Sequence, residues 1–162
     1  MLVDKTVNTA LEYYLGDRKK CPNLRKDFFI TKSAVELAEL IRNKEITSYQ
    51  VVNAYVNRII EVNPVLNAII DGPFMAALDE ATKLDARIKN GQVSLEEFNE
   101  KPFLGIPFTT KDSTAVGGKL HTLGLVSRKN TKASEDAECI KLMKDAGAII
   151  IATTTIPEIN RW

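Results

Sequence analysis

Residues 101–112 read Lys-Pro-Phe-Leu-Gly-Ile-Pro-Phe-Thr-Thr-Lys-Asp. The fold that we predict for the chain depends on these residues and on the elements that follow them. Phe103 to Thr110 is short, apolar and rich in residues that favour β-structure, so we predict a strand, which Gly105 and Pro107 mark as irregular or at a sheet edge. Lys111 to Asn130 contains three glycines without helical periodicity, which predicts a long loop. Loops of this length in compact domains are usually functional or disordered.

A helix and a second strand follow this loop. Ser134 is a suitable N-cap and Gly147 a suitable C′ residue for a helix whose apolar face would consist of Ala137, Cys139, Ile140, Leu142 and Met143. Ala148 to Ala152 is an uninterrupted apolar run, as expected of a strand that is covered on both faces. A β-loop-α-β order makes the two strands parallel, which places Lys111 and the run Thr153-Thr154-Thr155 along one rim of the sheet. Open α/β sheets bind ligands at that rim.

Lys111 is the ionisable residue at the end of the first of these strands. A lysine has an ordinary pKa of about 10.4, and lowering it by about three units costs about 4 kcal/mol. Burial beside Phe103, Ile106 and Phe108 is expected to supply this cost and to make Lys111 a candidate base. The competing interpretation is a solvated loop lysine, which is the usual state of this residue type.

The preceding part of the chain is predicted to be mainly helical. Residues 1–30 are interpreted as a lead-in segment. Two capping boxes, Ser33 with Glu36 and Thr47 with Gln50, each open a helix. The remaining predictions are a first helix that ends near Lys44, a second that Asn63-Pro64 closes, a short strand over Leu66–Ile70, a helix from about Pro73 to Asn90 and a single turn capped by Ser94.

Composition excludes several functional classes. The 22 basic and 21 acidic residues give a net charge of +1 and no electrostatic reason to expect a nucleic-acid partner. No run of about 18 apolar residues is present, so no membrane span is expected in this chain. A single histidine excludes a metal site built on histidine pairs, and nothing implies a cofactor. Two cysteines cannot form a disulfide framework; Cys139 is expected to be a buried thiol, and an intracellular location is favoured.

The number of strands is low for the number of helices. Sheets of α/β proteins usually have about four to six strands, and two or three are predicted here. The strand Ala148–Ala152 is expected to have one edge without a later strand to pair with. The predicted fold class is therefore α/β, with helices packed on an incomplete mixed sheet. Residues 31–162 are interpreted as the N-terminal part of a larger domain.

Several short motifs resemble the amidase signature family in order and spacing. The resemblance runs from about Thr31 to Trp162, and within the family the motifs are similar to those of fatty-acid amide hydrolases of the second type. The motifs are Pro102-x-Leu104-Gly105-Ile106-Pro107, Lys111-Asp112, Val116-x-Gly118, Thr122-x-Gly124, Asp136-Ala137, Gly147-Ala148-Ile149-Ile150 and Thr153-Thr154-x-x-Pro157-Glu158.

This resemblance implies a mechanism and a set of site residues. Lys111 matches the catalytic lysine of a Ser-Ser-Lys triad, in which one serine attacks an amide carbonyl and a second passes its proton to the lysine. Both serines belong to a Gly/Ser-rich signature that is expected after Trp162, so the chain alone is expected to be inactive. Thr153, Thr154, Thr155 and Asn160 would contact the substrate, a small-molecule amide. The family commonly has Gly-Lys-Thr-Asn where this chain has Ala152-Thr153-Thr154-Thr155. This departure bears on the expected contacts with the acyl group more than on the role of Lys111.

Two other functions remain open at this point. The chain could belong to the amidase-type subunit of a tRNA amidotransferase, which would need protein partners. It could also be a non-catalytic helical binding fragment, in which case Lys111 would be as exposed as its neighbours and the Thr153 rim would form no pocket. Membrane-bound relatives carry an anchor upstream, so membrane association of a full-length protein stays open, as does its oligomeric state.

Overall fold

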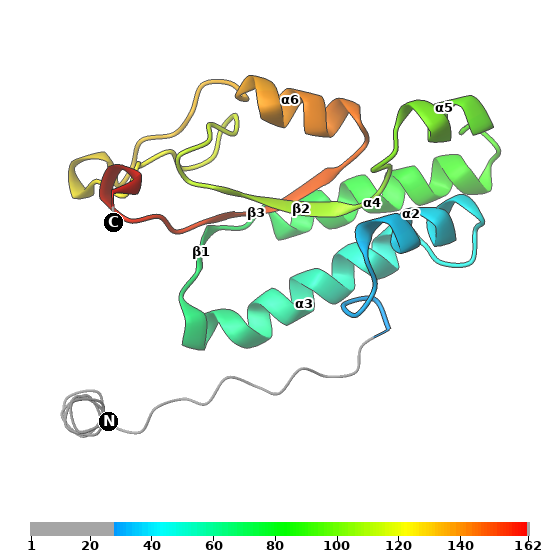
Figure 1. Ribbon diagram of the computed structural model, residues 1–162, viewed down its shortest axis with the longest axis horizontal. Helices are drawn as coiled ribbons and strands as arrows, with labels where there is room; N and C mark the ends of the chain where they lie inside the picture. The colour runs from blue at the N-terminus through cyan, green and yellow to red at the C-terminus, as the bar shows by residue number, and fades with distance from the viewer. Residues whose placement is uncertain (1–27, 162) are drawn as a thin grey trace.

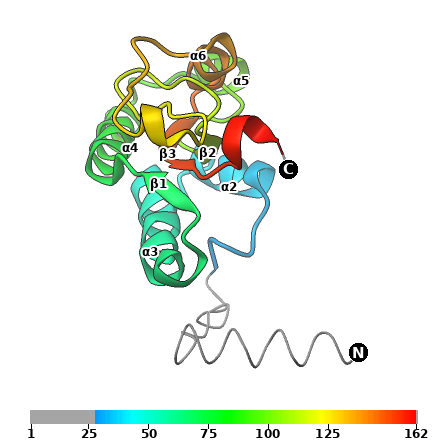
Figure 2. The same ribbon diagram turned by 90° about the vertical axis from the view of Figure 1, so that its left-hand side faces the viewer.

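Three strands form one mixed sheet at the centre of the computed structural model, which describes residues 28–161. Helix α6 lies on one side of the sheet and helices α3 and α4 lie on the other (Figures 1 and 2). Most of the predicted lead-in segment 1–30 lies outside the described residues. The elements are α2 (Ala34–Arg42), α3 (Ser48–Leu66), β1 (Ile69–Asp71), α4 (Phe74–Lys89), α5 (Leu95–Glu100), β2 (Pro107–Lys111), α6 (Glu138–Asp145) and β3 (Ile149–Thr154), with short 3-10 turns η1 (Val126–Arg128) and η2 (Glu158–Asn160).

The strand order is β1-β3-β2, so β3 is the central strand. Strand β2 runs parallel to β3, as predicted, with Lys111 opposite Thr154. Strand β1 pairs antiparallel with β3, with Ile69 also opposite Thr154. The prediction that the strand over Ala148–Ala152 has an unpaired edge was therefore wrong, because the short strand before α4 occupies that edge. Among the described strands, the open edges belong to β1 and β2.

Strand β3 is buried on both faces, as its apolar run predicts. Ile149 and Ile151 pack against α3 and α4, together with Val52, Val56, Ala77 and Ala81. Ile150 packs on the other side with Ile140 of α6 and with Val116 from the loop. The central strand thus joins the two helical layers.

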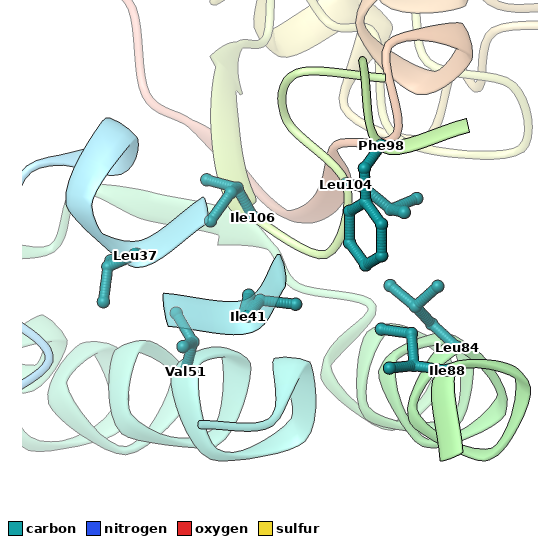
Figure 3. Close-up of a cluster of buried hydrophobic side chains, with 8 residues drawn as sticks. All are labelled: Leu37, Ile41, Val51, Leu84, Ile88, Phe98, Leu104 and Ile106. Atoms are coloured by element: carbon teal, nitrogen blue, oxygen red, sulfur yellow. The ribbon is translucent and has the colours of Figure 1, made fainter. Parts of the chain in front are cut away.

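A third apolar cluster fixes the chain just before β2. It joins α2, α3, α4 and α5 to the segment before the strand, and its buried members are Leu37, Ile41, Val51, Leu84, Ile88, Phe98, Leu104 and Ile106 (Figure 3). The buried hydroxyl of Ser48 donates to the carbonyl of Gly105 at 2.8 Å. A Cβ at Gly105 would lie 2.7 Å from the Ser48 oxygen, so only glycine allows this close approach.

Both predicted capping boxes are present, at Ser33 with Glu36 and at Thr47 with Gln50. The predicted end of the second helix at Asn63-Pro64 was wrong, because α3 continues to Leu66 with Pro64 inside it. Asn63 nevertheless shapes the end of this helix. Its side-chain oxygen accepts the amides of Ala68 and Ile69 at 2.8 and 2.9 Å and so turns the chain into β1.

Helix α6 begins later than predicted, at Glu138 instead of after Ser134. The carboxylate of Asp136 accepts the amide of Gly117 at 2.8 Å and binds the amine of Lys144 at 2.6 Å, which holds the segment before the helix against the loop. The prediction of a buried Cys139 was also wrong, because this thiol is exposed. Ile140 is the buried residue of this short helix. Within residues 28–161, every helix is too short or too polar to cross a bilayer.

Candidate active site

Lys111 is the last residue of β2 and lies opposite Thr154 on the neighbouring parallel strand. Its side chain is exposed, as is that of Thr109 two residues earlier. Successive strand residues point to opposite faces, so Thr109 and Lys111 share a face of β2 and Phe108 occupies the other, where it packs with Val116, Ile140 and Ile150. The expected shielding of Lys111 by Phe103, Ile106 and Phe108 was therefore wrong for this chain.

The three threonines after the apolar run differ in their surroundings. Thr153 is 1% exposed, and its hydroxyl donates to the carbonyl of Asp71 at 3.4 Å. Thr154 is half-buried, whereas Thr155 is exposed and its amide donates to the carbonyl of Ala68 at 2.8 Å. Thr154 and Thr155 thus present more of their surface to solvent than Thr153 does.

Asn160 is exposed and lies in η2, where the backbone has positive φ at both Ile159 (50°) and Asn160 (55°). The amide of Ile159 donates to the carbonyl of Leu123 at 2.8 Å. The structure thus brings Lys111 beside Thr154 and attaches the turn that carries Asn160 to the loop after β2.

Asp112 organises this loop, and we assigned it no function from the sequence. Its side chain accepts the Thr122 amide at 2.8 Å, the Thr122 hydroxyl at 2.5 Å and the Gly124 amide at 3.3 Å. Burial favours a raised pKa for Asp112, but hydrogen bonds from Thr122, Gly124 and Leu123 outweigh burial and hold the pKa below its ordinary value. The available signal was an aspartate directly after a strand, followed by a Thr-x-Gly segment.

A cavity of about 340 Å³ opens at the same rim. Asp112, Leu120, Thr122 and Gly124 line it from the loop, and Thr155 and Ile156 line it from the segment after β3. The non-catalytic alternative predicted an exposed Lys111 and no pocket at the Thr153 rim. The exposure of Lys111 agrees with that alternative. The cavity is lined by Asp112 and Thr155, which follow Lys111 and Thr154 in sequence, and by neither Lys111 nor Thr153.

No group of three or more His, Cys, Asp and Glu side chains within residues 28–161 lies close enough together to hold a metal ion. The chemistry available at the described rim is that of an amine, hydroxyl groups and one buried carboxylate. These groups suit proton transfer and hydrogen bonding to a polar substrate.

The sequence pattern of the family described as Amidase matches residues 50–162. Fatty-acid amide hydrolase 2-B of Danio rerio is 45% identical over 134 residues, which are 82% of this chain and 26% of that protein. Fatty-acid amide hydrolase 2 of Homo sapiens is 36% identical over 146 residues, 88% of this chain and 27% of that protein. A glutamyl-tRNA(Gln) amidotransferase subunit of Methylobacillus flagellatus is less similar, at 33% over 129 residues, 80% of this chain and 25% of that protein.

Among solved structures, the peptide amidase of Stenotrophomonas maltophilia superposes with a TM-score of 0.69 at 25% identity. The superposition covers 80% of this chain and 26% of the peptide amidase. The chain thus spans about a quarter of the length of the relatives it matches. The predicted family resemblance and the predicted α/β fold class, as one part of a larger fold, are confirmed.

Proposed function

Because the chain belongs to the amidase family, we propose that it forms the N-terminal part of a protein that hydrolyses carboxylic amide bonds. In this proposal residues 31–162 are the first part of an amidase domain, and the rest of the domain follows in a full-length protein. The relatives named fatty-acid amide hydrolase 2 share 36–45% identity with the chain, which favours fatty-acid amides as the substrate class.

In the proposed mechanism, Lys111 is the base of a Ser-Ser-Lys triad whose two serines lie in the rest of the domain. The neutral amine accepts a proton through the bridging serine while the second serine attacks the amide carbonyl. An acyl-enzyme forms, the amine product leaves with a proton, and water then releases the acid. The observation that carries this proposal is the position of Lys111, at the carboxyl end of an edge strand and in register with Thr154 of the parallel central strand.

Lys111 is exposed in the described residues, whereas a base needs an amine that is shielded from water. The proposed role therefore requires that other residues cover Lys111 in the full-length protein. The face of β2 that carries Thr109 and Lys111 is exposed in the described residues. We propose that the serine-bearing part of the domain packs on this face. Its packing would remove water from the amine and favour the neutral form that a base requires.

Thr153, Thr154, Thr155 and Asn160 are proposed to form the wall that contacts the acyl group. Thr155 and Asn160 are exposed and are the members best placed to meet a substrate directly. Thr153 is buried against β1 and would act by holding the rim in place.

The test replaces Lys111 with alanine in the full-length protein. Because a general base contributes about 10²–10⁴-fold to the rate, Lys111→Ala should lower kcat for a long-chain fatty-acid amide by at least about 100-fold. The thermal unfolding midpoint should change little, since Lys111 belongs to none of the three apolar clusters and its removal takes away a base and no core volume of the described residues. The matched control is Lys132→Ala, which removes another exposed lysine, in the loop before α6, and should keep wild-type turnover.

Wild-type turnover by Lys111→Ala would refute the assignment of the base. The chain of 162 residues is itself expected to show no amide hydrolysis and no labelling by a serine-directed fluorophosphonate, because the proposed nucleophile lies elsewhere. Turnover by this chain alone would contradict the proposed division of the triad.

A further inference from the structure

The carboxylate of Asp112 is enclosed by backbone amides of its own loop. Asp112 is 1% exposed, and its side chain accepts the amides of Thr122 and Gly124 as well as the Thr122 hydroxyl. Successive backbone amides that converge on an anion form a nest, a common anion site in proteins. Here the anion that the amides bind is the carboxylate of Asp112, a residue of the same loop. The backbone amide of Asp112 also donates to the carbonyl of Thr154 at 3.0 Å, which ties the site to β3.

The residues around this carboxylate hold a second turn that is distant in sequence. Leu123 and Gly124 both have positive φ, 57° and 70°, and the Leu123 carbonyl accepts the amide of Ile159 at 2.8 Å. A Cβ at Gly124 would lie 3.1 Å from the backbone of Glu158, so the loop backbone packs directly on η2. Figure 1 shows η2, in red, beside the yellow loop.

The turn that is held in this way has an unfavourable backbone. Ile159 and Asn160 both have positive φ, and for a β-branched residue such as Ile159 this conformation is a true outlier. Such conformations persist only where the surroundings impose them. Within the described residues, the Leu123 carbonyl supplies the bond to the Ile159 amide, and the Asn160 amide donates to the Pro157 carbonyl at 2.9 Å.

We infer that Asp112 is a positioning residue for substrate binding: its carboxylate fixes Thr122–Gly124, and this segment imposes the conformation of the turn that carries Asn160. The inference rests on the proposed function, in which Asn160 contacts the acyl group. Asp112 itself is buried, and its carboxylate accepts hydrogen bonds from residues of its own loop. Lys111 is exposed whereas Asp112, the next residue, is buried, so the two side chains lie in different surroundings. Asp112 should therefore affect substrate binding, whereas Lys111 should affect the chemical step.

The first test follows amide resonances of the ¹⁵N-labelled 162-residue chain by NMR as the pH is lowered. Because the pKa of Asp112 lies below its ordinary value, the Thr122 and Gly124 resonances should move with a midpoint below that of an ordinary aspartate. If the turn depends on this carboxylate, the Ile159 resonance should move with the same midpoint. Asp112→Asn should abolish the shared midpoint.

Asp136→Asn is the matched control, because Asp136 also accepts a loop amide, that of Gly117, and also has a lowered pKa, caused mainly by Lys144. This variant should change the Gly117 resonance and keep the shared midpoint of Thr122, Gly124 and Ile159. An Ile159 amide that does not follow the Thr122 midpoint in the wild-type chain would overturn the inference.

The second test measures kcat and KM of the full-length protein with a long-chain fatty-acid amide. Loss of a hydrogen-bonded carboxylate should raise KM about tenfold in Asp112→Asn and change kcat less than about threefold. Thr122→Val keeps the size of the side chain and removes only its hydroxyl, so a smaller rise in KM is expected and no large loss of folding. An unchanged KM in both variants would overturn the inference. Lys111→Ala reports separately on the base, since its effect should fall on kcat.

Discussion

Gly147→Ala should destabilise the chain strongly, because it adds a methyl group where two backbone segments touch. Gly147 follows the C-cap residue of α6 and has a φ of 89°. An added Cβ would lie 2.7 Å from the Cα and 3.0 Å from the amide nitrogen of Leu104, which is buried. The Gly147 carbonyl also accepts the amide of Gly105 at 2.9 Å, so a shift of either segment would disturb the start of the β2·β3 pair.

The size of the effect has two parts. A positive φ costs an L-residue about 1–2 kcal/mol. Overpacking against a buried neighbour that cannot rotate away adds about 1–3 kcal/mol. Gly147→Ala should therefore lower the free energy of unfolding by about 2–5 kcal/mol, a large part of the stability of an ordinary domain.

Gly91 provides a matched control. It follows the C-cap residue of α4, has a φ of 70°, and an added Cβ there would meet no atom within 4 Å. Gly91→Ala should cost only the backbone part, about 1–2 kcal/mol. Urea denaturation followed by circular dichroism measures both variants. With an m-value of about 2 kcal/mol per M, the midpoint should fall by about 1–2.5 M for Gly147→Ala and by about 0.5–1 M for Gly91→Ala. Equal shifts would refute the steric argument.

Two further predictions concern buried polar groups. Ser48→Ala removes the hydroxyl that donates to the Gly105 carbonyl, so it should lower the free energy of unfolding by about 1–3 kcal/mol, as measured by urea denaturation. The control Ser134→Ala, at an exposed position, should change the free energy of unfolding by less than about 0.5 kcal/mol. The folded-state pKa of Asp112 is lowered, so its contribution to stability is complete above the ordinary aspartate pKa of about 3.9 and is lost as the pH falls through the folded-state value. Asp112→Asn should therefore make the free energy of unfolding less dependent on pH below about 4, and an unchanged pH dependence would contradict this.

The parts of the fold that the sequence predicts well depend on neighbouring residues. The capping boxes at Ser33 and Thr47 join residues three positions apart, and the burial of β3 follows from an uninterrupted apolar run. The parallel pairing of β2 and β3 followed from the order of the elements.

The incorrect predictions have their causes in contacts between distant residues. Ser134 has the chemistry of an N-cap, but Asp136 accepts hydrogen bonds from the Gly117 amide and the Lys144 amine, and α6 begins only at Glu138. The pairing of β1 with β3 joins residues about 80 positions apart, so it could not be read from local patterns. The apolar neighbours of Lys111 in sequence do not cover its amine, because Phe108 faces the opposite side of β2. Asp112 was missed because its partners, Thr122 and Gly124, become visible only once the loop is folded.

The central position of β3 has a consequence for synthesis of the chain on the ribosome. Strands β1 and β2 both precede β3, and each pairs with β3 alone within the described sheet. Because about 80 residues separate β1 from β3, translation at about 5–20 residues per second leaves β1 without its partner for roughly 4–16 s. During that interval the apolar residues of α3 and α4 that pack against Ile149 and Ile151 lack these two partners. A nascent chain halted before residue 149 should therefore bind chaperones that recognise exposed apolar segments, and one that includes residue 154 and has cleared the exit tunnel should bind them less.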